Sequence, residues 1–177
     1  MNIEEFFLKS VGEWNSMRSG HSLAFQEFEE IRSKIKIVPS KSNDSIVDKF
    51  LKDNLITTNA VNKAFLINWE AKSEWGEEYQ KENYSGKSII VPIEISKTEG
   101  KIIRSVGYTE AIQVVSLYKI LEDETLIIYS DYNHLRTEER IRFVSNNLRS
   151  RSTVTRSIDS SAILQTSYAS EIRSIKK

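Results

Sequence analysis

The chain has 177 residues, 25 of them basic and 25 acidic, so its formal net charge is zero. That balance disfavours a general nucleic-acid-binding protein, which normally carries a basic excess, whereas the length suits one domain over residues 1–177 with a sizeable core. Cysteine is absent, which excludes disulfides, thiolate nucleophiles and thiolate metal sites.

The start of the chain does not resemble an export signal. The segment MNIEEFFLKSV has acidic residues where a signal peptide needs basic ones. No stretch approaches the roughly 20 apolar residues of a membrane span. We therefore expect a soluble intracellular protein.

Two short helices are predicted in the first third of the chain. Asn2 and Glu5 have the spacing of a capping box, and apolar residues follow at helical spacing, which predicts a helix over 3–11. A second helix is predicted at 44–53, where the apolar residues fall on one helical face.

The rest of the chain is typical of short antiparallel strands. Segments rich in Ile, Val, Thr, Tyr and Phe recur about every 10–14 residues with turn signals between them, and residues 76–87 form a longer polar loop. Many short strands with few helices favour a barrel or a sandwich. The ten predicted strands are 14–26, 31–39, 59–71, 87–97, 101–109, 111–121, 124–132, 137–145, 148–157 and 162–173.

Basic residues change type along the sequence. Between Lys119 and Lys176 there are seven arginines and no lysine, whereas elsewhere lysine outnumbers arginine by 15 to 3. Arginine offers a planar, bidentate donor that suits carboxylates and phosphates. The C-terminal third is therefore a candidate anion site, and the alternative is a solvated ribbon of ion pairs with Glu138, Glu139 and Glu171.

The strand faces in this region indicate a polar cavity. In 148–156, Arg149 and Arg151 share one face, and neither face is apolar enough for a filled core. The two arginines are about 7 Å apart along the strand, so both can address one end of a ligand. In the preceding strand, Glu139 shares a face with two apolar residues and points inward if they do. For Glu171 the pattern leaves both directions open.

Four segments are informative together, in their order and spacing: GEWNSMRSGH (12–21), NWEAKSEW (68–75), EERIRFVSNNLRSRST (138–153) and ASEIR (169–173). They resemble the S-type (CpcS/CpeS) phycobiliprotein lyases. The resemblance covers nearly the whole chain, and the G-x-W at 12–14 is also similar to the first-strand signature of lipocalins. It implies a mainly β fold, a closed antiparallel lipocalin-like or fatty-acid-binding-protein-like barrel of about ten strands with an N-terminal helix and a second short helix.

The resemblance also implies a function. Such a protein binds an open-chain tetrapyrrole (a bilin), here expected to be phycoerythrobilin or a related bilin, without a covalent bond. It then promotes thioether attachment of the bilin to a cysteine of a phycobiliprotein subunit. The bilin is the substrate, so neither a cofactor nor a metal is expected, and His21 and His134 are too isolated to suggest a metal site.

The implied site has two parts. By the family match, Glu139 and Glu171 hold and protonate the pyrrole nitrogens, and protonation makes the ethylidene carbon of the bilin more electrophilic toward a thiol. The implied propionate clamps are Arg149 and Arg151, with Thr153 adding a hydroxyl and Arg18 closing the same pocket. The implied stacking residues are Trp69 and Trp75, which lie against the bilin rings.

Two other interpretations stay open on the sequence alone. A passive lipocalin-type carrier of a bilin or another amphipathic acid would bind but not transfer its ligand. A nucleic-acid module built on the arginine-rich strand would bind oligonucleotides in a salt-dependent way. The sequence does not tell which bilin binds, which subunit accepts it, or whether the chain forms a homodimer.

Overall fold

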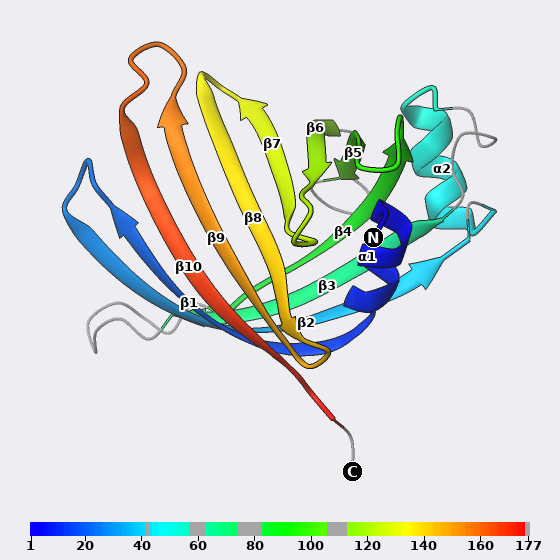
Figure 1. Ribbon diagram of the computed structural model, residues 1–177, viewed down its shortest axis with the longest axis horizontal. Helices are drawn as coiled ribbons and strands as arrows, with labels where there is room; N and C mark the ends of the chain where they lie inside the picture. Colours follow the sequence, from blue (N-terminus) through cyan, green and yellow to red (C-terminus); the bar gives the residue numbers. More distant parts are fainter. Residues whose placement is uncertain (42, 57–62, 74–82, 106–112, 176–177) are drawn as a thin grey trace.

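A closed barrel of ten antiparallel strands is the main feature of the protein (Figure 1). The computed structural model describes residues 1–41, 43–56, 63–73, 83–105 and 113–175. Each strand pairs with its neighbours in sequence, and β1 closes the barrel by pairing with β10. The strands are β1 (Gly12–Ser22), β2 (Glu27–Ser40), β3 (Ala64–Ser73), β4 (Asn83–Glu94), β5 (Glu99–Ser105), β6 (Gln113–Ile120), β7 (Leu126–Tyr132), β8 (Leu135–Ser145), β9 (Leu148–Ser157) and β10 (Ile163–Arg173).

Both predicted helices are confirmed. Helix α1 (Ile3–Ser10) begins with the expected capping box, in which the Asn2 side chain accepts from the Glu5 backbone N–H and the Glu5 carboxylate accepts from the Asn2 backbone N–H. Helix α2 (Ser45–Asp53) is capped by the Asp44 side chain. Neither is long and apolar enough to cross a membrane, and the described part of the chain contains no other candidate helix.

Strand boundaries differ from the predicted ones at two hairpins. The predicted strand 14–26 runs into the β1–β2 turn, where Gln26 has a φ of 54° and reverses the chain. The predicted loop 76–87 is shorter at its C-terminal end because β4 begins at Asn83 and pairs with β3. The first part of that loop lies outside the described residues, as does the start of the predicted strand 59–71.

The two helices pack on different sides of the barrel wall. Phe6 and Phe7 of α1 insert into one end of the interior, against a buried cluster that includes Trp14 and Phe65. Helix α2 lies on the outside beside β3, β4 and β5 (Figure 1). The apolar run 89–93 is therefore covered on both faces, with Ile90 packed inside and Ile89 and Val91 under α2. The barrel has one end filled by α1, and this end forms the floor of its interior.

Arg173, the last residue of β10, ties this floor together. Its guanidinium donates to backbone carbonyls at the end of α1, Lys9 at 2.6 Å and Val11, and to the Asn146 carbonyl in the β8–β9 turn at 3.1 Å. It also stacks on Trp14, with Cζ 4.3 Å from the ring centroid. One side chain thus connects the first helix, the first strand and the last strand.

We expect Arg173→Ala to lower the free energy of unfolding by about 2–4 kcal/mol, because charge-assisted hydrogen bonds and a cation–π contact are lost together. Urea denaturation followed by tryptophan fluorescence measures the change. Arg156→Ala, at an exposed position of β9, is the matched control and should change stability by under about 0.5 kcal/mol. Equal stability of the two variants would contradict the role given to Arg173.

Candidate functional site

The barrel interior holds a cavity of about 690 Å³ above the floor formed by α1. Side chains from all ten strands and from α1 line it. Its volume lies within the range of about 300–1,000 Å³ that is usual for small-molecule sites. The lining is two-sided: charged groups gather on β8, β9, β10 and β1, whereas isoleucines dominate β2 to β5.

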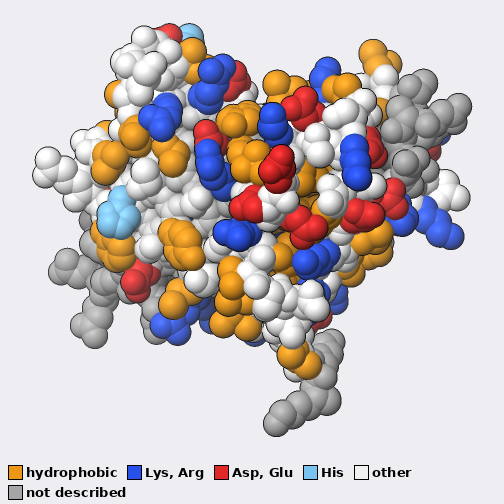
Figure 2. All heavy atoms as spheres, viewed as in Figure 1, with side chains coloured by type: hydrophobic (Ala, Val, Ile, Leu, Met, Phe, Trp, Pro, Cys, Tyr) orange, Lys and Arg blue, Asp and Glu red, His pale blue; other side chains and the backbone are white. Residues whose placement is uncertain are grey.

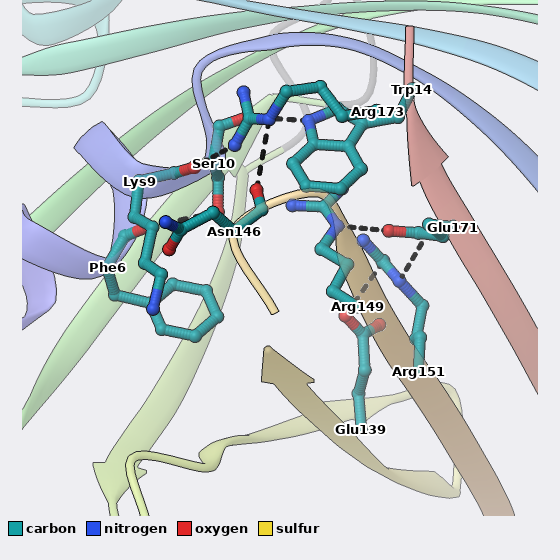
Figure 3. Close-up of polar contacts among 10 residues, drawn as sticks. All are labelled: Phe6, Lys9, Ser10, Trp14, Glu139, Asn146, Arg149, Arg151, Glu171 and Arg173. Carbon is teal, nitrogen blue, oxygen red and sulfur yellow. Dashed lines mark hydrogen bonds and ion pairs between the residues drawn. The ribbon is translucent and has the colours of Figure 1, made fainter. Parts of the chain in front are cut away.

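Four charged side chains converge on the charged wall (Figure 3). Arg149 Nε donates to Glu171 Oε2, Arg151 Nε lies 3.2 Å from the other Glu171 oxygen, and Arg151 Nη1 donates to Glu139 Oε1 at 2.9 Å. The strand register explains the convergence. Arg149 of β9 pairs with Glu171 of β10 on one side and with Phe143 of β8 on the other. Glu139 of β8 pairs with Thr153, which is the next inward-facing residue of β9 after Arg151. The cluster has two positive and two negative charges and is formally neutral.

Burial opposes the charge on both members of the Arg149–Glu171 pair. It lowers the pKa of Arg149 to about 10, which leaves the guanidinium charged at neutral pH. For Glu171, burial would raise the pKa, but the positive charges of Arg151 and Arg149 outweigh it and hold the pKa below its usual value. Glu171 is therefore an ionised carboxylate, which can accept hydrogen bonds.

Arg149 is held more tightly than its neighbour on the same strand face. Its side chain is 2% exposed, compared with 29% for Arg151, and it stacks on Trp14 with Cζ 4.4 Å from the ring centroid. Trp14 thus lies between Arg149 and Arg173, and its Nε1 donates to the Ser10 carbonyl at 2.8 Å. Arg149 therefore belongs to the packed floor as much as to the cavity. The alternation of side chains along β9 did not indicate this difference, because it places Arg149 and Arg151 on the same inward face.

The chain matches the family described as CpeS-like protein over residues 2–174. It belongs to that family. The chromophore lyase CpcS/CpeS 3 of Trichodesmium erythraeum is 39% identical over 98% of this chain and 100% of its own length. A Microchaete diplosiphon relative, provisionally named phycoerythrobilin lyase CpeS, is 33% identical over 84% of this chain and 66% of its own.

A solved structure supports the same assignment. The S-type phycobiliprotein lyase CPES from Guillardia theta superposes with a TM-score of 0.86 at 30% sequence identity, covering 100% of this chain and 95% of that one. The predicted family and the predicted barrel with two helices are therefore confirmed. The chain is a CpeS-like chromophore lyase in family and fold.

The structure brings most of the predicted site residues of this CpeS-like chain together. Arg18 on β1 and Trp69 on β3 line the cavity with Glu139, Arg149, Arg151 and Glu171. Thr153 shares the inward strand face but lines a smaller hollow beside the cavity instead. Trp75 lies outside the described residues, so its role stays a prediction.

Trp69 owes its position to a glycine on the next strand. Gly86 of β4 pairs with Trp69, and a Cβ at Gly86 would collide with the indole ring. The missing side chain leaves room for the ring to lie against β4 while 37% of the residue remains exposed. The indole is thus available to a flat ligand.

Two charged lining residues were missed by sequence reasoning. Arg104 on β5 and Glu29 on β2 both face the cavity. A compositional signal was present for Arg104: only Arg18, Arg32 and Arg104 are arginines in the first 118 residues, and two of these three line the cavity. Glu29 had no comparable signal in a chain with 25 acidic residues.

The arginine-rich segment contains both a solvated ribbon of ion pairs and arginines that face the cavity, the two alternatives that the sequence left open. Arg136 and Arg140 form ion pairs with Asp131 and Glu138, each at 2.7 Å and with more than half of the arginine side chain exposed, whereas Arg149 and Arg151 point inward. On the face shown in Figure 2, basic and acidic side chains are interspersed instead of gathering by sign. This face offers no continuous basic surface for a nucleic acid.

Glu171→Gln should lower the free energy of unfolding by about 3–5 kcal/mol at neutral pH, because Arg149 then stays buried without its carboxylate partner. Urea titration measures the loss. Glu138→Gln removes one partner of an exposed pair and should cost less than about 1 kcal/mol. If the two variants lose the same amount, the buried pair does not stabilise the fold in the way described.

The stability gap between the wild-type protein and Glu171→Gln should narrow in acid. The lowered pKa means that the carboxylate stabilises the fold above the unfolded-state pKa of about 4.3, and that this contribution disappears as the pH falls through the folded-state pKa. Glutamine does not titrate, so the variant lacks this dependence. A gap that stays constant through the acid limb would contradict the assigned ionisation of Glu171.

Proposed function

We propose that residues 1–177 form a single bilin-binding domain that acts as a phycobiliprotein chromophore lyase. It binds an open-chain tetrapyrrole without a covalent bond and promotes its thioether attachment to a cysteine of a phycobiliprotein subunit. The observation that carries the proposal is the cluster of two arginines and two glutamates, one buried pair and one half-buried pair, at a cavity of about 690 Å³. The names of the relatives described above point the same way.

The two-sided cavity matches the chemistry of a bilin. A bilin is a conjugated ligand with two propionates, so it needs cations on one side and apolar or aromatic surface on the other. Arg18 is exposed at the cavity and makes no ion pair with any described residue, and Arg151 is accessible on the same wall, with only the small side chain of Ala169 between them in register. We assign these two arginines to the propionates and Arg149 to holding Glu171. Trp69 offers the stacking surface.

The two glutamates take different parts in this proposal. Glu171 is ionised and can accept hydrogen bonds from pyrrole N–H groups. Glu139 is more exposed, at 18% of its side chain, and has a single ion pair with Arg151. We assign to Glu139 the proton that keeps the bilin conjugated system cationic.

The bond-forming step then balances without an oxidant. The acceptor sulfur forms a C–S bond to the ethylidene carbon, the π electrons of that double bond move into the protonated conjugated system, and the thiol proton is delivered to the ring carbon of the former double bond. The chain itself contains no cysteine, so it has no thiol that could trap the bilin before transfer.

The substrate is proposed to be phycoerythrobilin, in line with the name of the Microchaete diplosiphon relative. The proposed place of action is the cytoplasm or the plastid stroma. A homodimer is compatible with the proposal but is not required by it, since all the assigned residues line one barrel.

Mixing the protein with phycoerythrobilin should give a red-shifted, sharpened absorbance, and acid denaturation should release the bilin unchanged. Adding an apo-phycobiliprotein subunit should then yield an acid-stable adduct on that subunit, detected by zinc-enhanced fluorescence in a denaturing gel. Binding without faster adduct formation than in the protein-free mixture would indicate a passive carrier. Bilin that stays on this chain after acid denaturation would contradict non-covalent binding.

Glu139→Gln should slow transfer to the acceptor thiol by about 10²–10⁴-fold if a general acid is lost, with a smaller change in bilin affinity and a changed spectrum of the bound bilin. Stopped-flow absorbance measures transfer, and titration measures affinity. Glu138→Gln, on the outward face of the same strand, is the control. Wild-type transfer together with an unaltered spectrum would show that Glu139 has a structural role only.

A further inference from the structure

Arg104 lies on the wall of the cavity that faces the charged cluster. In the closed barrel, β5 is five strands away from β10 in either direction, so the two strands are diametrically opposed. β10 carries Glu171 and is flanked by β9 with Arg151 and β1 with Arg18. Arg104 therefore faces the middle of the wall to which the propionates are assigned.

The surroundings of Arg104 are apolar. Its partners in register are Ile90 on β4 and Val114 on β6, and both line the cavity beside it. Arg104 is exposed and forms no ion pair or hydrogen bond with any residue that the structure describes. Among the described lining residues of β4 to β7, it is the single charged side chain.

Hydroxyl groups on this wall are already engaged within the protein. Ser88 Oγ donates to the Ser105 carbonyl at 2.5 Å, and the Ser116 and Ser130 hydroxyls are 2.7 Å apart. No described residue accepts a hydrogen bond from the Arg104 guanidinium. A ligand oxygen that reaches this wall could therefore accept one from it. Such a donor bordered by isoleucine and valine favours an oxygen of an otherwise apolar ligand edge.

The chemistry of a bilin supplies such an oxygen. Its two propionates are on the two inner rings, and its two lactam carbonyls are on the outer rings. When the open chain curls to fit within a barrel, these groups lie on opposite edges of the ligand. With the propionates at Arg18 and Arg151, the lactam edge faces β5.

We propose that Arg104 donates a hydrogen bond to the lactam carbonyl of a terminal bilin ring and so fixes how the reactive end of the ligand is presented. The inference rests on the proposed function and deepens it, because it names a second subsite of the same cavity. Arg104 is a binding and positioning residue: it holds a carbonyl oxygen and exchanges no proton with it.

Two ligands separate this subsite from the propionate subsite. Phycoerythrobilin and its dimethyl ester have the same lactams, but the ester lacks the two carboxylates. Arg104→Ala should weaken binding of both ligands by the same factor, about tenfold to a hundredfold for one charge-assisted hydrogen bond. Arg151→Ala should instead weaken binding of the free acid much more than that of the ester. Absorbance titration gives the four dissociation constants.

Arg32→Ala is the matched control. Arg32 is the remaining arginine of the first 118 residues, and it is exposed on β2 without lining the cavity. It should leave both affinities unchanged. Arg104→Gln, which keeps an N–H donor without the charge, should restore part of the loss. Resonance Raman spectra should show the lactam C=O stretch shifted to higher frequency in Arg104→Ala and not in Arg32→Ala.

Each outcome decides one question. If Arg104→Ala weakens binding of the free acid only, Arg104 binds a propionate and the proposal is wrong. If Arg104→Ala binds both ligands as tightly as Arg32→Ala does, Arg104 makes no ligand contact and the proposal is equally wrong. If the wild-type protein binds neither ligand, it is the proposed function that fails.

Discussion

The stacking of Trp14 between two arginines is the contact on which the site depends. One guanidinium, from Arg173, joins the ends of the chain and caps α1. The other, from Arg149, extends under the cavity and pairs with Glu171. Cation–π contacts in a desolvated setting are worth about 2 kcal/mol each, so the indole stabilises the barrel floor and fixes the position of a buried charge at the same time.

The charged cluster combines a high desolvation cost with a low net charge. Buried ions are tolerated only with close partners, and replacing such a pair by apolar residues is often neutral or stabilising. Stability therefore does not explain why four ionisable groups line this wall. Glu171 and Arg149 form the deeper, fixed half, whereas Glu139 and Arg151 are more exposed and form the accessible half. Under the proposed assignment, a ligand carboxylate at Arg151 would compete with Glu139 for the guanidinium, so propionate binding and the glutamate assigned to proton transfer would be coupled.

Much of the architecture was readable from local sequence signals. The capping box of α1 and the number of strands follow from short-range rules, and both were confirmed, whereas two hairpin boundaries were predicted wrongly. The inward direction of Glu171 was not readable, because each face of β10 carries both apolar and polar residues, so the direction depends on pairing with β1 and β9. The difference between Arg149 and Arg151 was hidden for a similar reason: alternation gives the face of a residue but not its height above the floor.

Arg104 marks the limit of strand-by-strand reasoning. The role proposed for it depends on closure of the barrel, which sets β5 opposite β10 although 57 residues lie between the end of β5 and the start of β10. No local pattern indicates that opposition. The use of arginine in a lysine-rich half was the available clue, and it gains meaning only once the cavity is known.

The exchange of lysine for arginine after Lys119 has a geometric explanation. Arg149 and Arg173 lie against the two faces of Trp14, which requires a planar cation. Arg151 reaches Glu139 and Glu171 with different nitrogens, and Arg136 engages both carboxylate oxygens of Asp131. A lysine ammonium can lie over a ring, as Lys9 does over Phe143, but it is a compact point charge that cannot stack flat on an indole or present two fixed donors to a carboxylate. The preference for arginine over lysine in this segment therefore follows from planar and two-point contacts, which occur both inside and outside the barrel. The charge of a ligand is a second and smaller reason for it.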